Sequence, residues 1–117
     1  MSGRLSCSIA AAVLIVMIAA VVINAIYVKD TADNILMLID DPGSSISALS
    51  KYWDERIPKL RLTLSQKELD DISLNINEAI ICAEKEDDEE YKRSMARLRR
   101  AIEGIRKREE FSLENIF

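Results

Sequence analysis

The residues best suited to chemistry are an acidic run from Glu84 to Glu90, broken only by Lys85. Carboxylate oxygens are the ligands that Ca²⁺ prefers, so the run is a candidate cation site. It lacks the alternating Asp and Gly spacing of a calcium-binding loop. A solvated helix end, where acidic side chains meet the positive end of the helix dipole, is the better interpretation.

Other catalytic and ligand-binding patterns are missing from the 117 residues. The chain has no His, so a Ser or Cys nucleophile lacks its usual base and a di-iron site lacks its Glu-x-x-His pairs. Its three glycines, Gly3, Gly43 and Gly104, form no phosphate loop. The neighbouring Tyr52 and Trp53 are better interpreted as core aromatics than as a ligand platform. The sequence therefore predicts no enzyme, no metal and no cofactor.

The two cysteines, Cys7 and Cys82, lie far apart in the sequence, at the edge of an apolar segment and within a charged region. A membrane between them would prevent a disulfide. We interpret both as small packing residues. Lipidation of Cys7 and an intermolecular disulfide through Cys82 are the alternatives.

Composition predicts an all-α protein whose apolar and charged residues are segregated. Hydrophobic residues make up 49% and charged residues 31%, with few aromatics, glycines or prolines. All 20 acidic residues and 15 of the 16 basic ones, all but Arg4, follow residue 28, which leaves a net charge of −5 there. A mildly acidic domain argues against a nucleic-acid partner.

Residues 9–28 form an almost unbroken apolar segment, and no charge occurs between Arg4 and Lys29. About 20 apolar residues in a helix cross the hydrocarbon core of a bilayer. A cleaved secretory signal has a shorter apolar region and small residues before the cut, whereas here the bulky Ile23 precedes Ala25. We expect residues 9–28 to be a retained transmembrane helix in the lipid bilayer, with cleavage as the alternative.

The flanks of this segment predict its orientation. The N-terminal flank carries Arg4 and no acid, while the other flank mixes Lys29 with several acids. The positive-inside rule then places residues 1–8 in the cytoplasm and the C-terminus outside, with Tyr27 at the outer interface. We expect a single-pass protein of the cell membrane.

Beyond the span, apolar spacing continues the helix to Ile39, and Pro42 with Gly43 ends it. Residues 29–43 are therefore a predicted juxtamembrane helix and turn. Residues 44–117 are a predicted extracytoplasmic helical domain.

The first helix of that domain is capped by Ser44 or Ser45, and Pro58 predicts a kink or break in it. Ser65 and Glu68 have the spacing of a capping box, so a new helix begins there. The apolar stripe of the first helix comprises Ile46, Leu49, Trp53, Ile57, Leu60 and Leu64.

The next two helices form a predicted antiparallel hairpin, around which a small bundle is built. The acidic run separates them, and Arg106 to Arg108 mark the end of the second by complementing its dipole. The matching stripes are Leu69, Ile72, Ile76, Ala79 and Ala83 on one helix, and Tyr91, Met95, Leu98, Ile102 and Ile105 on the other.

Two groups of apolar residues remain outside these stripes. Leu74 and Ile81, one heptad apart, predict a second contact surface. The tail Glu109–Phe117 is unusually apolar for a chain end, so we expect it to pack along its own bundle or to enter a partner's groove. The candidate interaction surface comprises Leu74, Ile81, Phe111, Leu113, Ile116 and Phe117.

Several of these features together resemble a bacterial family known as domain of unknown function 4363. They are the single N-terminal span, Trp53 in the second outer helix, the helix opening Glu68–Ile72, the acidic break near Asp87 and the ending Phe111–Phe117. The resemblance covers essentially the whole chain and implies a protein of the bacterial cell membrane. It implies no activity.

The predicted function is that of a non-enzymatic, membrane-anchored module that binds another membrane or extracytoplasmic protein, or a second copy of itself. The alternative is an extracytoplasmic sensing module that holds a small ligand between its helices. The anchor favours the first hypothesis because confinement to a membrane raises the local concentration of a co-resident partner.

Overall fold

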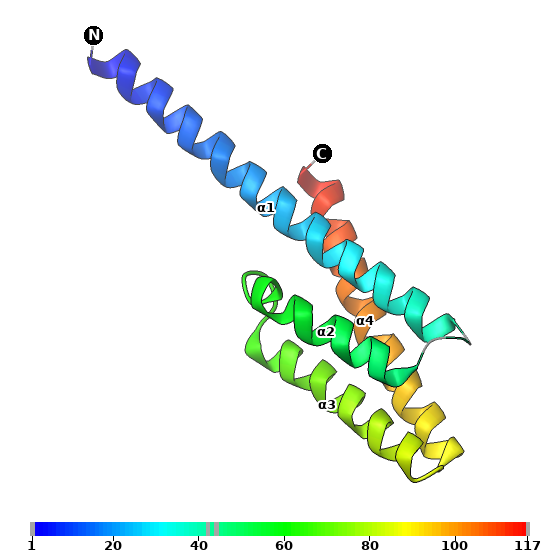
Figure 1. The fold of residues 1–117 in the computed structure, drawn as a ribbon. Helices are drawn as coiled ribbons and strands as arrows, with labels where there is room; N and C mark the ends of the chain where they lie inside the picture. Colours follow the sequence, from blue (N-terminus) through cyan, green and yellow to red (C-terminus); the bar gives the residue numbers. More distant parts are fainter. Residues whose placement is uncertain (1, 42, 44, 117) are drawn as a thin grey trace.

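The computed structural model describes all residues except Met1, Pro42, Ser44 and Phe117. The predictions made for Pro42, Ser44 and Phe117 therefore lie outside the described residues. Across the described part the chain forms four helices and no strand, which confirms the all-α prediction. The helices are α1 (Ser2–Asp40), α2 (Ile46–Leu60), α3 (Gln66–Glu84) and α4 (Asp88–Ile116), arranged up and down around one core (Figure 1).

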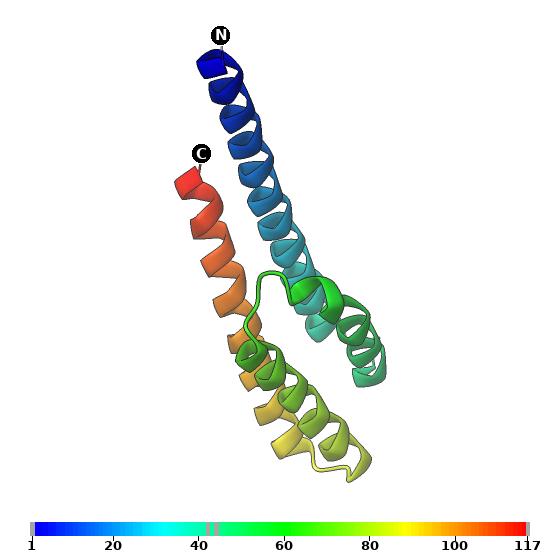
Figure 2. The ribbon, with the colours of Figure 1, turned by 90° about the vertical axis from the view of Figure 1, so that its left-hand side faces the viewer.

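α1 has two halves with different surroundings. Its side chains from Gly3 to Val21 are all exposed, and this half projects away from the other helices in both views (Figures 1 and 2). From Ala25 onward a residue on one face is buried every three or four positions, ending with Ile35. The predicted continuation through Ile39 is confirmed, so one helix both projects from the bundle and belongs to it.

The projecting half of α1 is long and apolar enough to cross a membrane. Only 6% of its most apolar stretch of 18 residues is buried inside the protein, whereas the core helix of a soluble protein is mostly buried. A membrane anchor and a signal sequence share this length and composition.

α2 begins at the predicted cap, since the Ser45 hydroxyl accepts a hydrogen bond from Ala48 N. Pro58 lies inside α2, and the helix ends at Leu60, two residues later. The interruption predicted at Pro58 therefore comes slightly beyond it. A proline near the end of a helix disturbs only the last turn, and Leu64 N still bonds Leu60 O at 2.8 Å in the turn that follows.

The predicted capping box opens α3. The Ser65 hydroxyl accepts from Glu68 N, and the Glu68 carboxylate accepts from Ser65 N. In the α3–α4 turn, Glu86 adopts a left-handed conformation with φ of 58°. The Asp87 carboxylate then accepts a hydrogen bond from Glu90 N at the start of α4, which confirms the acidic run as a helix boundary.

One prediction about the end of α4 was wrong. The helix does not end at Arg106 to Arg108 but continues to Ile116. The tail forms the last turns of the same helix, in which Glu109 is buried and Leu113 half-buried while Phe111 is exposed. No Gly or Pro follows Gly104, so nothing local stops the helix.

The core lies where all four helices meet, and Trp53 is its largest side chain. Its indole Nε1 donates a hydrogen bond to Ser73 Oγ at 2.8 Å, which satisfies the only polar atom of the buried ring. Most residues of the predicted stripes are buried. Ala83 is exposed, and Ile46, Ile57, Tyr91 and Met95 are half-buried. The core cluster comprises Val28, Ala32, Ile35, Leu49, Trp53, Leu60, Leu64, Leu69, Ile72, Ile76, Leu98, Ile102 and Ile105.

Truncation of two isoleucines tests this packing. Ile102 is 1% exposed, so Ile102→Ala leaves a cavity and is expected to cost about 2–5 kcal/mol of unfolding free energy. Ile81 is 48% exposed, so Ile81→Ala is expected to change stability by about 0.5 kcal/mol or less. Denaturation of the full-length protein in detergent, followed by circular dichroism, measures both. Equal losses for the two variants would contradict the described core.

Candidate functional site

Leu74 and Ile81 lie on the face of α3 that points away from the core. They are 57% and 48% exposed, while Ile72 and Ile76 on the opposite face are about 1% exposed. A spacing of seven residues is two helical turns, so the two side chains share one face. We call Leu74 and Ile81 the α3 patch.

The tail residues of the candidate surface lie on the last turns of α4. Phe111 is 64% and Ile116 is 40% exposed, Leu113 is half-buried, and Phe117 is outside the described residues. We call residues 109–116 the α4 tail.

The structure does not bring the α3 patch and the α4 tail together. α3 and α4 are antiparallel, and Glu68 pairs with Arg108 across them. Leu74 lies six residues from Glu68 toward one end of the bundle, and Phe111 lies three residues from Arg108 toward the other. At 1.5 Å per residue they are separated by about 14 Å along the bundle axis. The single predicted surface is therefore two separate surfaces.

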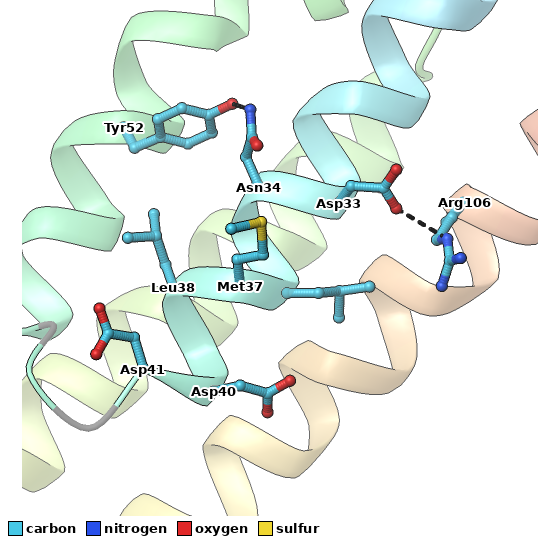
Figure 3. A pocket seen from close by; sticks show the side chains of 9 residues that line it. Asp33, Asn34, Met37, Leu38, Asp40, Asp41, Tyr52 and Arg106 are labelled. Atoms are coloured by element: carbon cyan, nitrogen blue, oxygen red, sulfur yellow. Dashed lines mark hydrogen bonds and ion pairs between the residues drawn. The ribbon is translucent and has the colours of Figure 1, made fainter.

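An open depression of about 870 Å³ lies beside the packed half of α1 (Figure 3). Two pairs of its polar side chains contact each other. Asp33 Oδ1 lies 2.8 Å from Arg106 Nε, and Asn34 Nδ2 donates to the Tyr52 hydroxyl at 2.9 Å. Met37 supplies apolar surface. A ligand here would compete with existing pairs.

The other residues considered from the sequence, Tyr52 and the two cysteines, have the following surroundings. Tyr52 stacks under Arg56, whose guanidinium carbon is 4.4 Å from the ring centroid, so this aromatic is also engaged within the protein. Cys7 is exposed on α1, and Cys82 is half-buried on α3; both are free thiols. Among the described residues, no three His, Cys, Asp or Glu side chains converge in a way that would hold a metal ion.

A ladder of ion pairs joins α1 and α4 and was not predicted from the sequence. Asp33 pairs with Arg106, and Asp40 pairs with Arg99. The acids are seven residues apart on α1, and the arginines are seven apart on α4. Matching heptad spacing with opposite charge was therefore a usable signal for two neighbouring antiparallel helices.

A third pair joins α4 to α3, between Arg108 and Glu68. The hydrogen bond from Arg108 lowers the pKa of the Glu68 carboxyl, and the Ser65 amide lowers it further, while burial works in the opposite direction. The same hydrogen bond raises the pKa of Arg108. Glu68 therefore serves both the helix cap and the link between helices.

The family described as Domain of unknown function (DUF4363) matches residues 27–116. The chain belongs to this family. No curated protein and no solved structure matches it.

The matched DUF4363 region corresponds to the packed part of the fold. It begins at Tyr27, close to the point where α1 enters the bundle, and ends at Ile116, the last residue of α4. It contains the capping box, Trp53 and every ion pair described above. The projecting half of α1 lies almost entirely outside the match.

The role of Glu68 is testable through pH. Because its pKa is lowered on folding, the pair with Arg108 stabilises the fold above the ordinary pKa of Glu, about 4.3. This contribution is lost as pH falls through the lowered pKa. Glu68→Gln keeps a capping-box side chain and is expected to cost about 0.5 kcal/mol at neutral pH, the size of a partly exposed pair.

Chemical denaturation at a series of pH values measures this difference. The difference in unfolding free energy between the original protein and Glu68→Gln is expected to decrease as the pH becomes acidic. Glu110→Gln, at an exposed position of α4, is the control. A difference that stays constant with pH would show that the carboxylate charge of Glu68 does not stabilise the fold.

Proposed function

We propose that the protein is a membrane-anchored, non-enzymatic interaction module. α1 is the anchor, and the four-helix bundle stands on the extracytoplasmic side of the cell membrane. The α3 patch contacts another membrane or extracytoplasmic protein, or a second copy of the chain.

The observation that carries the proposal is the exposure of the α3 patch on an otherwise regular amphipathic helix. Single exposed apolar residues are common on proteins. Here two large aliphatic side chains lie on one face, two turns apart, directly opposite the buried stripe. Apolar side chains at this spacing on one face can pack against a second helix.

The exposed half of α1 supports the anchor. Side chains such as Leu14, Ile15 and Val16 are 58%, 66% and 66% exposed, and no other helix covers them. In water this surface would be a strong aggregation site, whereas in a bilayer it faces lipid. The positive-inside rule applied to Arg4 supports the orientation.

A sensing or ligand-binding role is the alternative. It draws on the depression beside α1, whose lining includes Asp33 and Arg106. Because that depression is open and these two side chains already pair, we favour the interaction role. Ligand-dependent thermal shifts of the full-length protein would reverse this preference.

Photo-crosslinking in membranes tests the interaction role. A photoreactive amino acid at position 74 or 81 is expected to form a specific covalent adduct, whereas the same residue at Ala96, exposed on α4, is expected to form little. Mass spectrometry then identifies the adduct. An adduct with a second copy assigns the patch to self-association. Equal labelling from all three positions would remove the support for the proposal.

The anchor itself is tested on the protein extracted from cell membranes. Its mass is expected to include residues 9–28, and extraction is expected to require detergent rather than high salt or alkali. A mature N-terminus near Ala25 or Ile26 would instead identify the segment as a cleaved signal.

A further inference from the structure

Contacts between α1 and α2 fix how far α2 reaches toward the anchor. Asn34 bonds Tyr52, and seven residues further along α2, Lys59 Nζ lies 5.5 Å from the centroid of Tyr27. Tyr27 is seven residues back along α1, so the two antiparallel helices keep one register. Carrying this register three residues further places the α2–α3 turn at the level of Asn24.

Contacts between α1 and α4 fix the reach of α4 independently. Arg99 pairs with Asp40, and Arg106 pairs with Asp33, again with equal steps of seven residues. Ten further residues along α4 place Ile116 at the level of α1 residue 23. The burial of Ala25, which is 3% exposed, agrees with this reach.

Two segments that are distant in sequence therefore end at the same height, beside the last turns of the 9–28 span. Figure 1 shows the α2–α3 turn and the C-terminal end of α4 on either side of the middle of α1. We call residues 59–64 and 109–116 together the anchor-proximal end of the bundle.

The anchor-proximal end exposes large apolar side chains at its tips. Leu62 is 72% exposed at the tip of the turn, and Phe111 and Ile116 are 64% and 40% exposed on the α4 tail. None of the three has a place in the core. Beside the outer end of a membrane span, such side chains meet the interfacial layer of the bilayer.

Charge distinguishes the α2–α3 turn and its flanks from the opposite turn of the bundle. From Arg56 to Lys67 there are four basic residues and no acidic one, whereas Glu84–Glu90 contains six acidic residues and one basic. Basic residues beside apolar ones match an anionic phospholipid surface. The acidic turn lies at the other end of α3, away from that surface.

The acidic residues near the anchor lie on elements other than the α2–α3 turn, and Asp30 on α1 is exposed. Glu68 is paired with Arg108, and Glu109 is buried with its carboxylate 3.5 Å from Arg108 Nε. Glu110 and Glu114 are exposed on the α4 tail. The basic contacts therefore belong to the α2–α3 turn, and the α4 tail contributes apolar contact.

We propose that the anchor-proximal end rests in the headgroup layer of the bilayer that holds α1, with Leu62, Phe111 and Ile116 inserted and Lys59 and Arg61 on anionic phospholipid headgroups. This inference rests on the proposed membrane anchor. It assigns the apolar α4 tail to lipid rather than to a protein groove. The bundle is then seated on the membrane and not held above it.

The test uses full-length protein in vesicles of phosphatidylcholine and phosphatidylglycerol. After both native cysteines are replaced by Ala, an environment-sensitive fluorophore is attached to a new cysteine at position 16, 62, 81 or 111. Lipids that carry a nitroxide near the headgroup or deep in the acyl chain report the depth of each label.

The expected result is deep quenching at position 16, shallow lipid quenching at 62 and 111, and none at 81. Deep quenching at 16 with labels at 62 and 111 in water would overturn the inference and leave the anchor intact. A blue-shifted signal at 62 and 111 without lipid quenching would overturn it in favour of a protein contact. No lipid quenching at 16 would overturn the anchor and the inference together.

Charge variants test the headgroup contact separately. In some molecules the labels at positions 62 and 111 lie in the headgroup layer, and in others they lie in water. Lys59→Gln and Arg61→Gln are each expected to lower the ratio of the first population to the second about fivefold, which corresponds to about 1 kcal/mol per basic residue at an anionic surface. Lys85→Gln in the acidic turn is the matched control and is expected to have no effect. Loss of phosphatidylglycerol is expected to mimic both variants. Lipid quenching at positions 62 and 111 that does not change with lipid charge or with these substitutions would overturn the electrostatic contact.

Discussion

The antiparallel seam between α1 and α4 determines the rest of the structure. Complete burial of one Ile, Leu or Val contributes about 1.5–3 kcal/mol, whereas a partly exposed ion pair contributes about 0–1 kcal/mol. The apolar side chains between these helices therefore supply most of the stability. The pairs of Asp33 with Arg106 and Asp40 with Arg99 fix which residues face each other. Stability and register thus come from different groups on the same two helices.

The other two helices depend on this seam. α4 is the longest helix of the matched DUF4363 region and packs against both α1 and α3. α2 closes the remaining side, where Trp53 contacts the common core and bonds Ser73. Because the loops are short, the height of every turn follows from the α1–α4 register.

Local sequence signals predicted most of the helices and their buried faces. The Ser65–Glu68 capping box and the stripe around Leu98 and Ile102 act within one helix, so periodicity and capping rules identify them. The same rules misinterpreted Arg106 to Arg108 as a helix end. Basic residues at a helix end and basic residues that pair across helices look alike in one segment. Only the acids on α1 and α3, distant in sequence, distinguish the two cases.

The sequence indicated that Leu74 and Ile81 lie off the buried stripe but not how they are arranged relative to the α4 tail. Exposure of Leu74 and Ile81 follows from their position off the buried stripe. The separation of this patch from Phe111 does not, because it depends on the direction in which α4 leaves the bundle. The absence of Gly and Pro after Gly104 favours continued helix, so the α4 tail extends α4 and does not form a separate segment.

The unbroken backbone of α1 connects its projecting apolar half rigidly to the bundle. A span responds to bilayer thickness by tilting. The molecule is 72 Å long and 23 Å wide. A small tilt of a membrane-spanning α1 would therefore displace the α3–α4 turn, at the far end, sideways by more than it displaces the span itself. In the proposed membrane arrangement, bilayer thickness would thereby set the tilt at which the bundle meets its surroundings.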